Sequence, residues 1–510
     1  MRQSGILMPI FSLPSKFGVG AFDREAYKFV DFLEKSAQGC WQVLPIGPTG
    51  FGNSPYQPIS AFAGNPYFIS LEGLIEQGLL TWDECNACDF GNNQEKVDYG
   101  ALYNNRRNVL KKAYERFTEK LSHDEELKKK YESFIKEQNY WLKDYALFCV
   151  IKDINNGKPW YEWENDQKTR DKHALETIAS DKAFEIDFIY FEQFIFDVQW
   201  SALHEYVNKK NIDIIGDMPF YLSLDSADVW QHPEEFQLDK DLLPKVVAGC
   251  PPDAFSATGQ MWGNPIYDWK ASAQNGYSWW MERMKRNSEL FDTIRIDHFH
   301  GFSEYYAIPY GAEDATKGKQ EKGPGMDFFK ALKKTLGDVS LIAEDLGTVT
   351  KENEALLTES GIPGMKVLQY AFTSWDSKYL THRHEKNSVV YTGTHDNTPT
   401  RAWVEEIQEG HRDFTRRYVN SRNSDFGGLV WDIIREAYHS QADLCIIPIQ
   451  DYLVKGREAR INSPGTLDGN WEWRLVPDFL SDALAGSIRE MVETYGRVPK
   501  DKTKDTEVSK

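Results

Sequence analysis

Short apolar runs that end in polar, glycine or proline residues recur along the chain, and charged, helix-like stretches separate most of the later ones. Runs of this kind are typical of strands in a parallel sheet, which are buried on both faces. Alternation of such strands with helices favours an α/β fold. Eight runs are found: GILMPIF near Ile6, CWQVLPIG near Val43, IDIIGDMPFYL near Ile214, TIRIDHF near Ile296, LIAEDLG near Ile342, MKVLQYAF near Leu368, SVVYTGTHDN near Val390 and LCIIPIQDYL near Ile447.

The number of runs predicts the architecture. Eight strands that alternate with helices indicate an α/β protein built on one (β/α)8 TIM barrel that spans residues 1–510. A doubly wound open sheet would usually carry a glycine-rich phosphate turn after its first strand, and none follows Ile10. Roughly sixty residues remain after the eighth run, which leaves no room for a C-terminal β-sandwich domain.

The spacing of the runs is uneven, and the gaps predict insertions at the C-terminal face of the barrel. Residues 67–205, between the second and third strands, are charged and mostly helical in pattern. Residues 225–290, between the third and fourth, include a stretch rich in Gly, Pro and Trp that we expect to form an ordered, lid-like loop at 248–266. The segment 498–510 is a polar tail that we expect to be disordered.

Polar residues stand where several strands end, which is where TIM barrels form active sites. The fourth run ends in Arg295, Asp297 and His298, and the seventh in His395 and Asp396. The third run ends in Asp217, and the fifth in Glu344 and Asp345. Carboxylates on several strand ends that face one mouth indicate a shared site.

Strand geometry narrows the roles. Side chains alternate across a strand, so Arg295 and Asp297 share one face and Ile294 and Ile296 the other. We expect the guanidinium to lower the pKa of Asp297 and keep it ionised, as a nucleophile requires. Glu344 and Asp345 are adjacent, so only one of them can face the mouth.

Two carboxyl groups on neighbouring strand ends match a retaining glycosidase, in which they lie about 5–5.5 Å apart. One attacks the anomeric carbon while the other protonates the leaving oxygen, so their pKa values must differ. We expect the charges of Asp297 and Asp396 to raise the pKa of Glu344.

Other interpretations of each motif remain open when it is taken alone. Arg295 and Asp297 fit a structural ion pair, and GTHDN and AEDLG fit turns with a helix cap. A metal site at His298, His395 and Asp396 would not explain Arg295 beside a carboxylate. The three motifs together favour catalysis.

Composition limits the classes of molecule that we expect this protein to bind. A formal net charge of −19 disfavours nucleic acid and anionic membranes and suits a neutral substrate. Aromatic residues make up 14% of the chain, which fits sugar-binding loops, although core packing is the simpler explanation. Six scattered cysteines, with CNAC as the one close pair, indicate free thiols in a reducing compartment. With no apolar leader or spanning segment, we expect a cytoplasmic location.

The motifs FDTIRIDHFHGF, LIAEDLG and YTGTHDNTPT resemble those of the α-amylase clan. In detail the chain resembles the 4-α-glucanotransferases, also called amylomaltases or disproportionating enzymes, of glycoside hydrolase family 77. This closer resemblance rests on four stretches: SPYQPISAFAGNPYFISL, GDMPFYLSLDSADVW, AGCPPDAFSATGQMWGNPIYDW and GIPGMKVLQYAF. It extends from Ile6 to about Trp473 and is poorest in the helical insertion.

The resemblance implies a role for each matching position. Asp297 matches the nucleophile, Glu344 the general acid/base and Asp396 the transition-state stabiliser. Further positions are implied to hold sugar. Arg295, His298 and His395 act at the cleavage point, Tyr56 binds glucan away from it, Tyr370 lies on the acceptor side, Trp262 is in the lid, and Asp217, Asn264 and Asp253 are additional contacts.

The implied activity is transfer of an α-1,4-glucan segment to the 4-hydroxyl of glucose or another glucan, with no metal or organic cofactor. Maltooligosaccharides, amylose and glycogen are the implied substrates, and a monomer or simple homo-oligomer is expected. An α-amylase-like hydrolase with the same carboxylates is the alternative, and a non-catalytic glucan-binding protein is a remote one.

Overall fold

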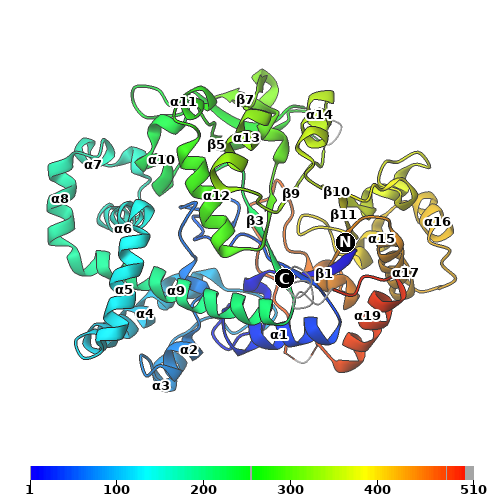
Figure 1. Cartoon of the computed structure of the whole chain (residues 1–510), viewed down its shortest axis with the longest axis horizontal. Coiled ribbons are helices and arrows are strands. Elements are labelled where there is room, and N and C mark those ends of the chain that lie inside the picture. Colours follow the sequence, from blue (N-terminus) through cyan, green and yellow to red (C-terminus); the bar gives the residue numbers. More distant parts are fainter. Residues whose placement is uncertain (1, 253–255, 348, 478, 500–510) are drawn as a thin grey trace, which may run out of the picture.

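The computed structural model describes residues 2–252, 256–347, 349–477 and 479–499. Its centre is a closed barrel of eight parallel strands in the spatial order β1-β12-β11-β10-β9-β6-β3-β2 (Figure 1). Each of the eight apolar runs contributes one strand, so the predicted TIM barrel is confirmed. The strands are β1 (Gln3–Leu7), β2 (Cys40–Gln42), β3 (Asp213–Met218), β6 (Thr293–Ile296), β9 (Leu341–Ala343), β10 (Gly364–Val367), β11 (Ser388–Tyr391) and β12 (Leu444–Pro448).

Helices surround the barrel because each has an apolar face to bury against the strands. Helix α1 buries Ala26, Phe29, Val30 and Leu33, which recur every three to four residues. The connection from β10 to β11 has only the short 3₁₀ turns η7 (Leu368–Thr373) and η8 (Thr381–Arg383). The barrel helices are α1 (Arg24–Lys35), α9 (Ala183–Lys209), α12 (Ser278–Leu290), α13 (Met326–Leu336), α14 (Lys351–Ser360), α17 (Phe426–His439) and α19 (Asp482–Thr494).

Two apolar clusters confirm the alternation along the strands. Ile294 and Ile296 of β6 belong to the large cluster that includes the helices. Ile215 of β3 belongs to a small separate cluster inside the barrel, together with Leu7, Met365 and Ile446 among others. Since side chains alternate, the inner face that carries Ile215 also carries Asp217. The charged residues of β3 and β6 therefore point to the inside of the barrel at its carboxyl end.

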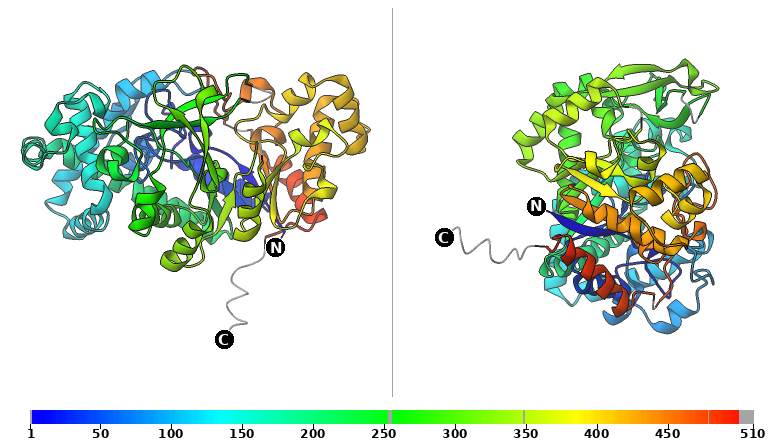
Figure 2. Two further views of the ribbon diagram at one scale, coloured as in Figure 1. Left: turned by 90° about the horizontal axis from the view of Figure 1, so that it is seen from above. Right: turned by 90° about the vertical axis from the view of Figure 1, so that its right-hand side faces the viewer.

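The first insertion is mostly helical and lies on one side of the barrel, whereas α15 (Thr400–Glu406), α16 (Glu409–Tyr418) and α17 lie on the other (Figures 1 and 2). Its last helix, α9, returns to the barrel and packs against α1, α12 and β3. The helices are α2 (Leu71–Glu76), α3 (Trp82–Asn86), α4 (Tyr99–Leu121), α5 (Glu125–Glu137), α6 (Asn139–Ile154), α7 (Asn165–Lys168), α8 (Lys172–Asp181) and α9.

The second insertion contains regular structure where we expected a loop. The segment expected as a loop at 248–266 holds much of β4 (Val246–Cys250) and β5 (Gln260–Pro265). They join β7 (Glu304–Pro309) and β8 (Lys319–Lys322) in an antiparallel sheet of order β5-β4-β7-β8. Because β4 pairs with β7, which follows the fourth barrel strand, local sequence patterns do not reveal this sheet. Residues 253–255 lie outside the described part of the chain.

After β12 the chain returns to the first helix of the barrel. Helix α19 packs against α1, and the Arg489 guanidinium donates to the carbonyls of Glu34 and Lys35. Of the predicted polar tail, residues 500–510 lie outside the described residues. Within the described part of the chain, every helix is too short or too polar to cross a membrane. The six cysteines all lie in that part, and each is a free thiol, as predicted.

Candidate active site

The carboxyl ends of β3, β6, β9 and β11 bring together the side chains that the sequence places after these strands. Strands β3, β6 and β9 are direct neighbours in the barrel, and β11 is separated from β9 by β10. The backbone N–H of Asp297 donates to the carbonyl of Met218 (3.0 Å), and that of Glu344 to Ile296 (3.0 Å). The pairing of the strands therefore continues up to the predicted catalytic positions.

Arg295 and Asp217 form the buried base of the site. Arg295 Nη1 donates to both carboxylate oxygens of Asp217 (2.7 and 2.8 Å) and to Asp297 Oδ1 (3.2 Å). The Tyr56 hydroxyl donates to the same Asp217 carboxylate (2.8 Å). Arg295 and Asp217 are almost fully buried, whereas the Asp297 side chain is 29% exposed. The guanidinium is thus paired first with Asp217, and Asp297 remains accessible.

This arrangement corrects the prediction for Asp297. Burial raises the pKa of Asp297 well above its usual range, the Arg295 charge opposes the shift, and the nearby carboxylates Asp217, Glu344 and Asp396 add to it. Arg295 acts in the expected direction, but burial and the negative neighbours outweigh it. The expectation of a lowered pKa at Asp297 was wrong because burial, together with the neighbouring carboxylates, outweighs the charge of Arg295.

Glu344 and Asp345 are separated by their hydrogen bonds. The Glu344 carboxylate accepts the backbone N–H groups of His298 (2.8 Å) and Leu346 (2.9 Å). Asp345 instead accepts the N–H of Met365 on the next strand (2.6 Å). Burial raises the pKa of Glu344, and Arg295 and the two N–H groups oppose the shift. The predicted direction holds, although burial is its first cause. Glu344 therefore lies beside the residue that follows Asp297, while Asp345 supports β10.

Asp396 lies on the loop after β11, which β10 separates from the strand of Glu344. Its side chain is 42% exposed, and Asn462 Nδ2 donates to Asp396 Oδ1 (2.6 Å). His395 beside it is buried, and its ring stacks on Tyr56 with centroids 4.9 Å apart at 14°. Burial lowers the pKa of His395, so we expect a neutral imidazole.

His298 links the barrel to the small sheet. It has the positive φ of 48° that non-glycine residues seldom adopt, which costs on the order of 1–3 kcal/mol. Its ring meets Trp262 of β5 edge to face, with centroids 5.0 Å apart. Burial lowers the pKa of His298 to about 3, so it stays neutral at physiological pH. This neutral ring therefore lies against Trp262 of the small sheet.

The remaining predicted residues fall into different places. Tyr56, expected away from the cleavage point, lies in the cluster itself against Asp217 and His395. The Tyr370 hydroxyl accepts from Asn397 Nδ2 (3.1 Å), and the residue is 40% exposed. Asn264 is buried and its side-chain amide donates to the carbonyl of Leu222 (2.7 Å), which ties β5 to the loop after β3. Asp253 lies outside the described residues.

Three residues that we did not predict also reach the site. Trp471 packs against Tyr56 and His395, with ring centroids 5.6 and 6.0 Å away. Asn462 binds Asp396, and Tyr221 lies near His298 and Trp262. The stretch INSPGTLDGNWEW, rich in Asn, Gly and Trp like the other loops of the mouth, is the signal that would have indicated the first two.

The chain is similar to known proteins over nearly its whole length. A family model described as 4-alpha-glucanotransferase matches residues 8–479. A 4-alpha-glucanotransferase of Clostridium butyricum is 44% identical over 492 residues, which cover 96% of this chain and 100% of the relative. A chloroplastic/amyloplastic 4-alpha-glucanotransferase of Solanum tuberosum is 39% identical, with 98% and 87% covered. The structure of an amylomaltase from Streptococcus agalactiae in complex with acarbose is 37% identical, with a TM-score of 0.94 and 98% and 100% covered.

Proposed function

Because this chain belongs to the 4-alpha-glucanotransferase family and is a transferase of that type, we propose that Asp297, Glu344 and Asp396 carry out the transfer of α-1,4-glucan segments. The reaction is a retaining double displacement. Asp297 attacks the anomeric carbon at the cleaved linkage while Glu344 protonates the oxygen of the leaving glucan. The products of this first half are a covalent glycosyl ester on Asp297 and a shorter glucan that departs.

The second half reverses the roles of the two groups. Glu344, now ionised, takes the proton of the 4-hydroxyl of glucose or another glucan as that oxygen attacks the anomeric carbon. The ester bond to Asp297 breaks, and its carboxylate is restored. Two inversions at the same carbon give net retention. Asp396 stabilises the positive charge that develops on the sugar in both transition states.

The placement of Asp297 and Glu344 directly after the adjacent strands β6 and β9 is the observation that carries the proposal. Neighbouring strands lie about 4.7–4.9 Å apart, close to the roughly 5–5.5 Å that a retaining pair needs. A backbone N–H one residue beyond Asp297 donates to Glu344, which holds the two groups in register. Burial raises the pKa of both Glu344 and Asp297, so these shifts do not divide the two roles, and the assignment of Glu344 as the proton donor rests on its match to the family.

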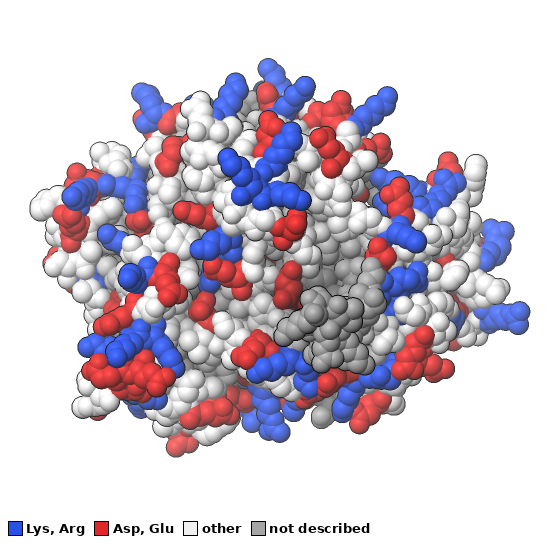
Figure 3. All heavy atoms as spheres, viewed as in Figure 1, with Lys and Arg blue, Asp and Glu red and all other residues white. Residues whose placement is uncertain are grey.

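We propose that the surrounding polar and aromatic side chains bind the glucan. Arg295, Asp217, His298 and His395 would hold the sugar at the cleavage point, and Tyr56 joins this group because of its position. Trp262, Tyr370, Asn264 and Asp253 remain proposed contacts or supports on either side. Basic and acidic side chains are interspersed on the described face in Figure 3, and the net charge is −19. Both features suit a neutral substrate such as a maltooligosaccharide, amylose or glycogen.

Transfer exceeds hydrolysis if the acceptor glucan binds while water is excluded. We propose that the small sheet around Trp262 provides this exclusion. Incubation of the pure protein with maltotriose alone, followed by separation of products by size, tests the function. A ladder of longer maltooligosaccharides together with glucose is expected. Glucose and maltose with nothing longer would show an α-amylase-like hydrolase instead.

We propose a cytoplasmic enzyme of maltodextrin, starch or glycogen metabolism. The six free thiols support a reducing compartment, whereas the potato relative is described as chloroplastic/amyloplastic. Immunodetection of the protein in fractionated source cells would test the location. Loss of growth or of glucan turnover on deletion of the gene, with maltodextrin or stored glucan as carbon source, would test the pathway.

A further inference from the structure

One buried carboxylate holds both ends of the loop that carries Asp396. Asp451 lies in α18 (Ile449–Tyr452), directly after β12, and is 1% exposed. It accepts hydrogen bonds from Thr392 Oγ1 (2.5 Å), Thr400 Oγ1 (2.6 Å) and the Thr400 backbone N–H (2.7 Å). Thr392 follows β11, and Thr400 begins α15 (Thr400–Glu406). The span from 392 to 400 that contains His395 and Asp396 is thus closed at its base by one side chain.

The chain offers no local substitute for this contact. The N-cap of α15 is Pro399, whose side chain has no acceptor for the Thr400 N–H. Asp451 supplies that acceptor from another strand end. Burial raises the pKa of Asp451, and its bonds to Thr392 and Thr400 act in the opposite direction. A buried carboxylate is costly unless it is fully hydrogen-bonded, and these three donors meet that requirement.

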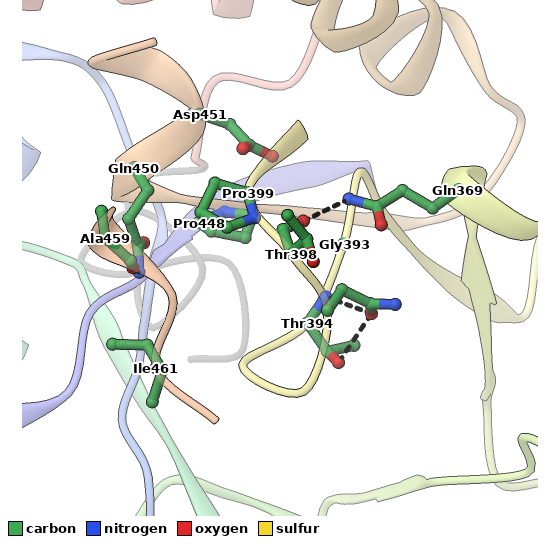
Figure 4. Close-up of a pocket in the computed structure, with 11 residues that line it drawn as sticks. Gln369, Gly393, Thr394, Thr398, Pro399, Pro448, Gln450, Asp451, Ala459 and Ile461 are labelled. Carbon is green, nitrogen blue, oxygen red and sulfur yellow. Dashed lines mark hydrogen bonds between the residues drawn. The ribbon is translucent and has the colours of Figure 1, made fainter. Parts of the chain in front are cut away.

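Gln369 of η7 also holds the loop through hydrogen bonds. The Gln369 backbone N–H donates to the carbonyl of Thr392 (3.2 Å), and Gln369 Nε2 donates to the carbonyl of Thr398 (2.9 Å). Figure 4 shows this bond, with Asp451 and Gln450 drawn from the α18 segment. Gly393 lies so near that an added Cβ would approach Gln369 Nε2 to 2.7 Å. The loop is therefore held by η7 and by α18. A residue larger than glycine at position 393 would press against Gln369.

The space beneath the loop is not the sugar site. The cavity between these residues measures about 10 Å³, which is close to the volume needed for a single water. It is lined by the inner side of the loop and by α18 (Figure 4). His395, Asp396 and Asn462, whose side chain binds Asp396, are not among the residues that line this cavity. Contacts on the inner side can consequently act on catalysis only through the position of the loop.

We propose that Asp451 is a positioning residue of the transfer reaction, which acts by fixing both ends of the loop so that Asp396 faces the reacting sugar. The inference rests on the proposed role of Asp396. Misplacement of a group by about 1 Å costs roughly 10²-fold in rate. Asp451 therefore affects kcat far more than the binding of substrate.

Substitutions at Asp451 separate positioning from general stability. Alanine removes all three hydrogen bonds. Asparagine keeps the shape, because its carbonyl can accept the Thr400 N–H while its amide donates to the two threonine hydroxyls, which can also act as acceptors. Asp292 is the matched control, since it too accepts three hydrogen bonds, from His204, Asn208 and Ile214, but at the opposite end of the barrel.

The test measures kcat and KM for maltotriose well below each variant's melting temperature. D451A should lose roughly 10²-fold in kcat with KM changed by less than about threefold, and D451N should stay within roughly fivefold of the native kcat. D292A should lower the melting temperature and leave kcat unchanged. If D451A does not fold, T392V removes one donor with little change of shape and should lower kcat several-fold.

Three results would overturn the inference: native kcat in D451A, a loss in D451N as large as that in D451A, or native kcat in T392V when D451A is unfolded. The variant D396N distinguishes this failure from that of the proposed function. An inactive D396N beside a fully active D451A would refute the positioning role alone. A fully active D396N would refute the role of Asp396 itself and the inference with it.

Discussion

The two ends of β6 carry the same residue type in opposite electrostatic states. Asp292 immediately precedes the strand and accepts hydrogen bonds from His204 (2.9 Å), Asn208 (3.0 Å) and the backbone of Ile214 (2.8 Å). Burial acts to raise the pKa of Asp292, but these donors outweigh it and the pKa is lowered. Asp297 immediately follows the strand, and its pKa is raised.

The difference shows how one scaffold separates stability from chemistry. A carboxylate that is surrounded by donors stabilises the fold, whereas one that lies among other carboxylates is held in an unfavourable state that a reaction can use. In TIM barrels the amino end of the strands supports the fold and the carboxyl end carries the active site. Here the change occurs within the length of a single four-residue strand.

The largest expected effect comes from removing the charge at the carboxyl end. D297N should lower kcat by at least about 10⁴-fold, because no other group can form the glycosyl ester. Its melting temperature should equal or exceed the native value, because a neutral amide removes a buried carboxylate from an acidic cluster. Maltotriose turnover and thermal unfolding of the same preparation measure both. Substantial remaining turnover would refute the nucleophile.

The second effect concerns the proton donor. E344Q should lower kcat by about 10²–10⁴-fold. In the native enzyme, turnover should decline on the alkaline side, because Glu344 must be protonated, and its raised pKa moves that decline to higher pH. A pH–rate profile from pH 4 to 9 measures the decline.

The neighbouring D345N is the control for this variant. Asp345 supports Met365 on β10, so its substitution should affect stability and leave most of the activity. An inactive D345N together with an active E344Q would reverse the assignment of the two residues.

The third effect tests the amino end of the barrel. D292A should lower the free energy of unfolding by about 1–3 kcal/mol, because the N–H of Ile214 and two side-chain donors lose their acceptor. Its kcat should stay within about twofold of native, because the change lies at the opposite end of the barrel from the carboxylate cluster. Chemical denaturation and turnover assays measure these quantities. A large loss of kcat in the folded variant would contradict the division between the two ends.

The smallest effect is the pH dependence of the contribution that Asp292 makes to the free energy of unfolding. Because the folded pKa of Asp292 is lowered, the unfolded chain binds more protons between the folded and unfolded values, and stability rises with pH across that window. The stabilisation is fully present above the unfolded value near 3.9 and is lost as the pH falls through the folded one. The difference in unfolding free energy between native protein and D292A should therefore narrow from pH 7 to pH 3. A constant difference would exclude an electrostatic origin.

Much of the barrel could be predicted because its signals are local. The eight apolar runs, the shared face of Arg295 and Asp297 and the carboxylates after the strands follow from the period of two and from the rule that such sites form at the strand ends. The sheet of β4, β5, β7 and β8 was missed because its central pair joins segments on both sides of the fourth barrel strand. Trp471 and Asn462 were missed for a related reason, since the composition of INSPGTLDGNWEW indicates a loop of the mouth but not that its residues return to Tyr56 and Asp396.

The sequence by itself determined the order of the strands along the chain, the shared face of Arg295 and Asp297, and the strand ends that carry Asp297, Asp396 and one of Glu344 and Asp345, because these depend on spacing along one strand or on the end of that strand. Only the tertiary structure decided that Arg295 pairs first with Asp217, that burial raises the pKa of Asp297, and that Asp451 closes the loop of Asp396. These properties depend on distances between residues far apart in the chain and on the exclusion of water. Local periodicity contains no information on either quantity.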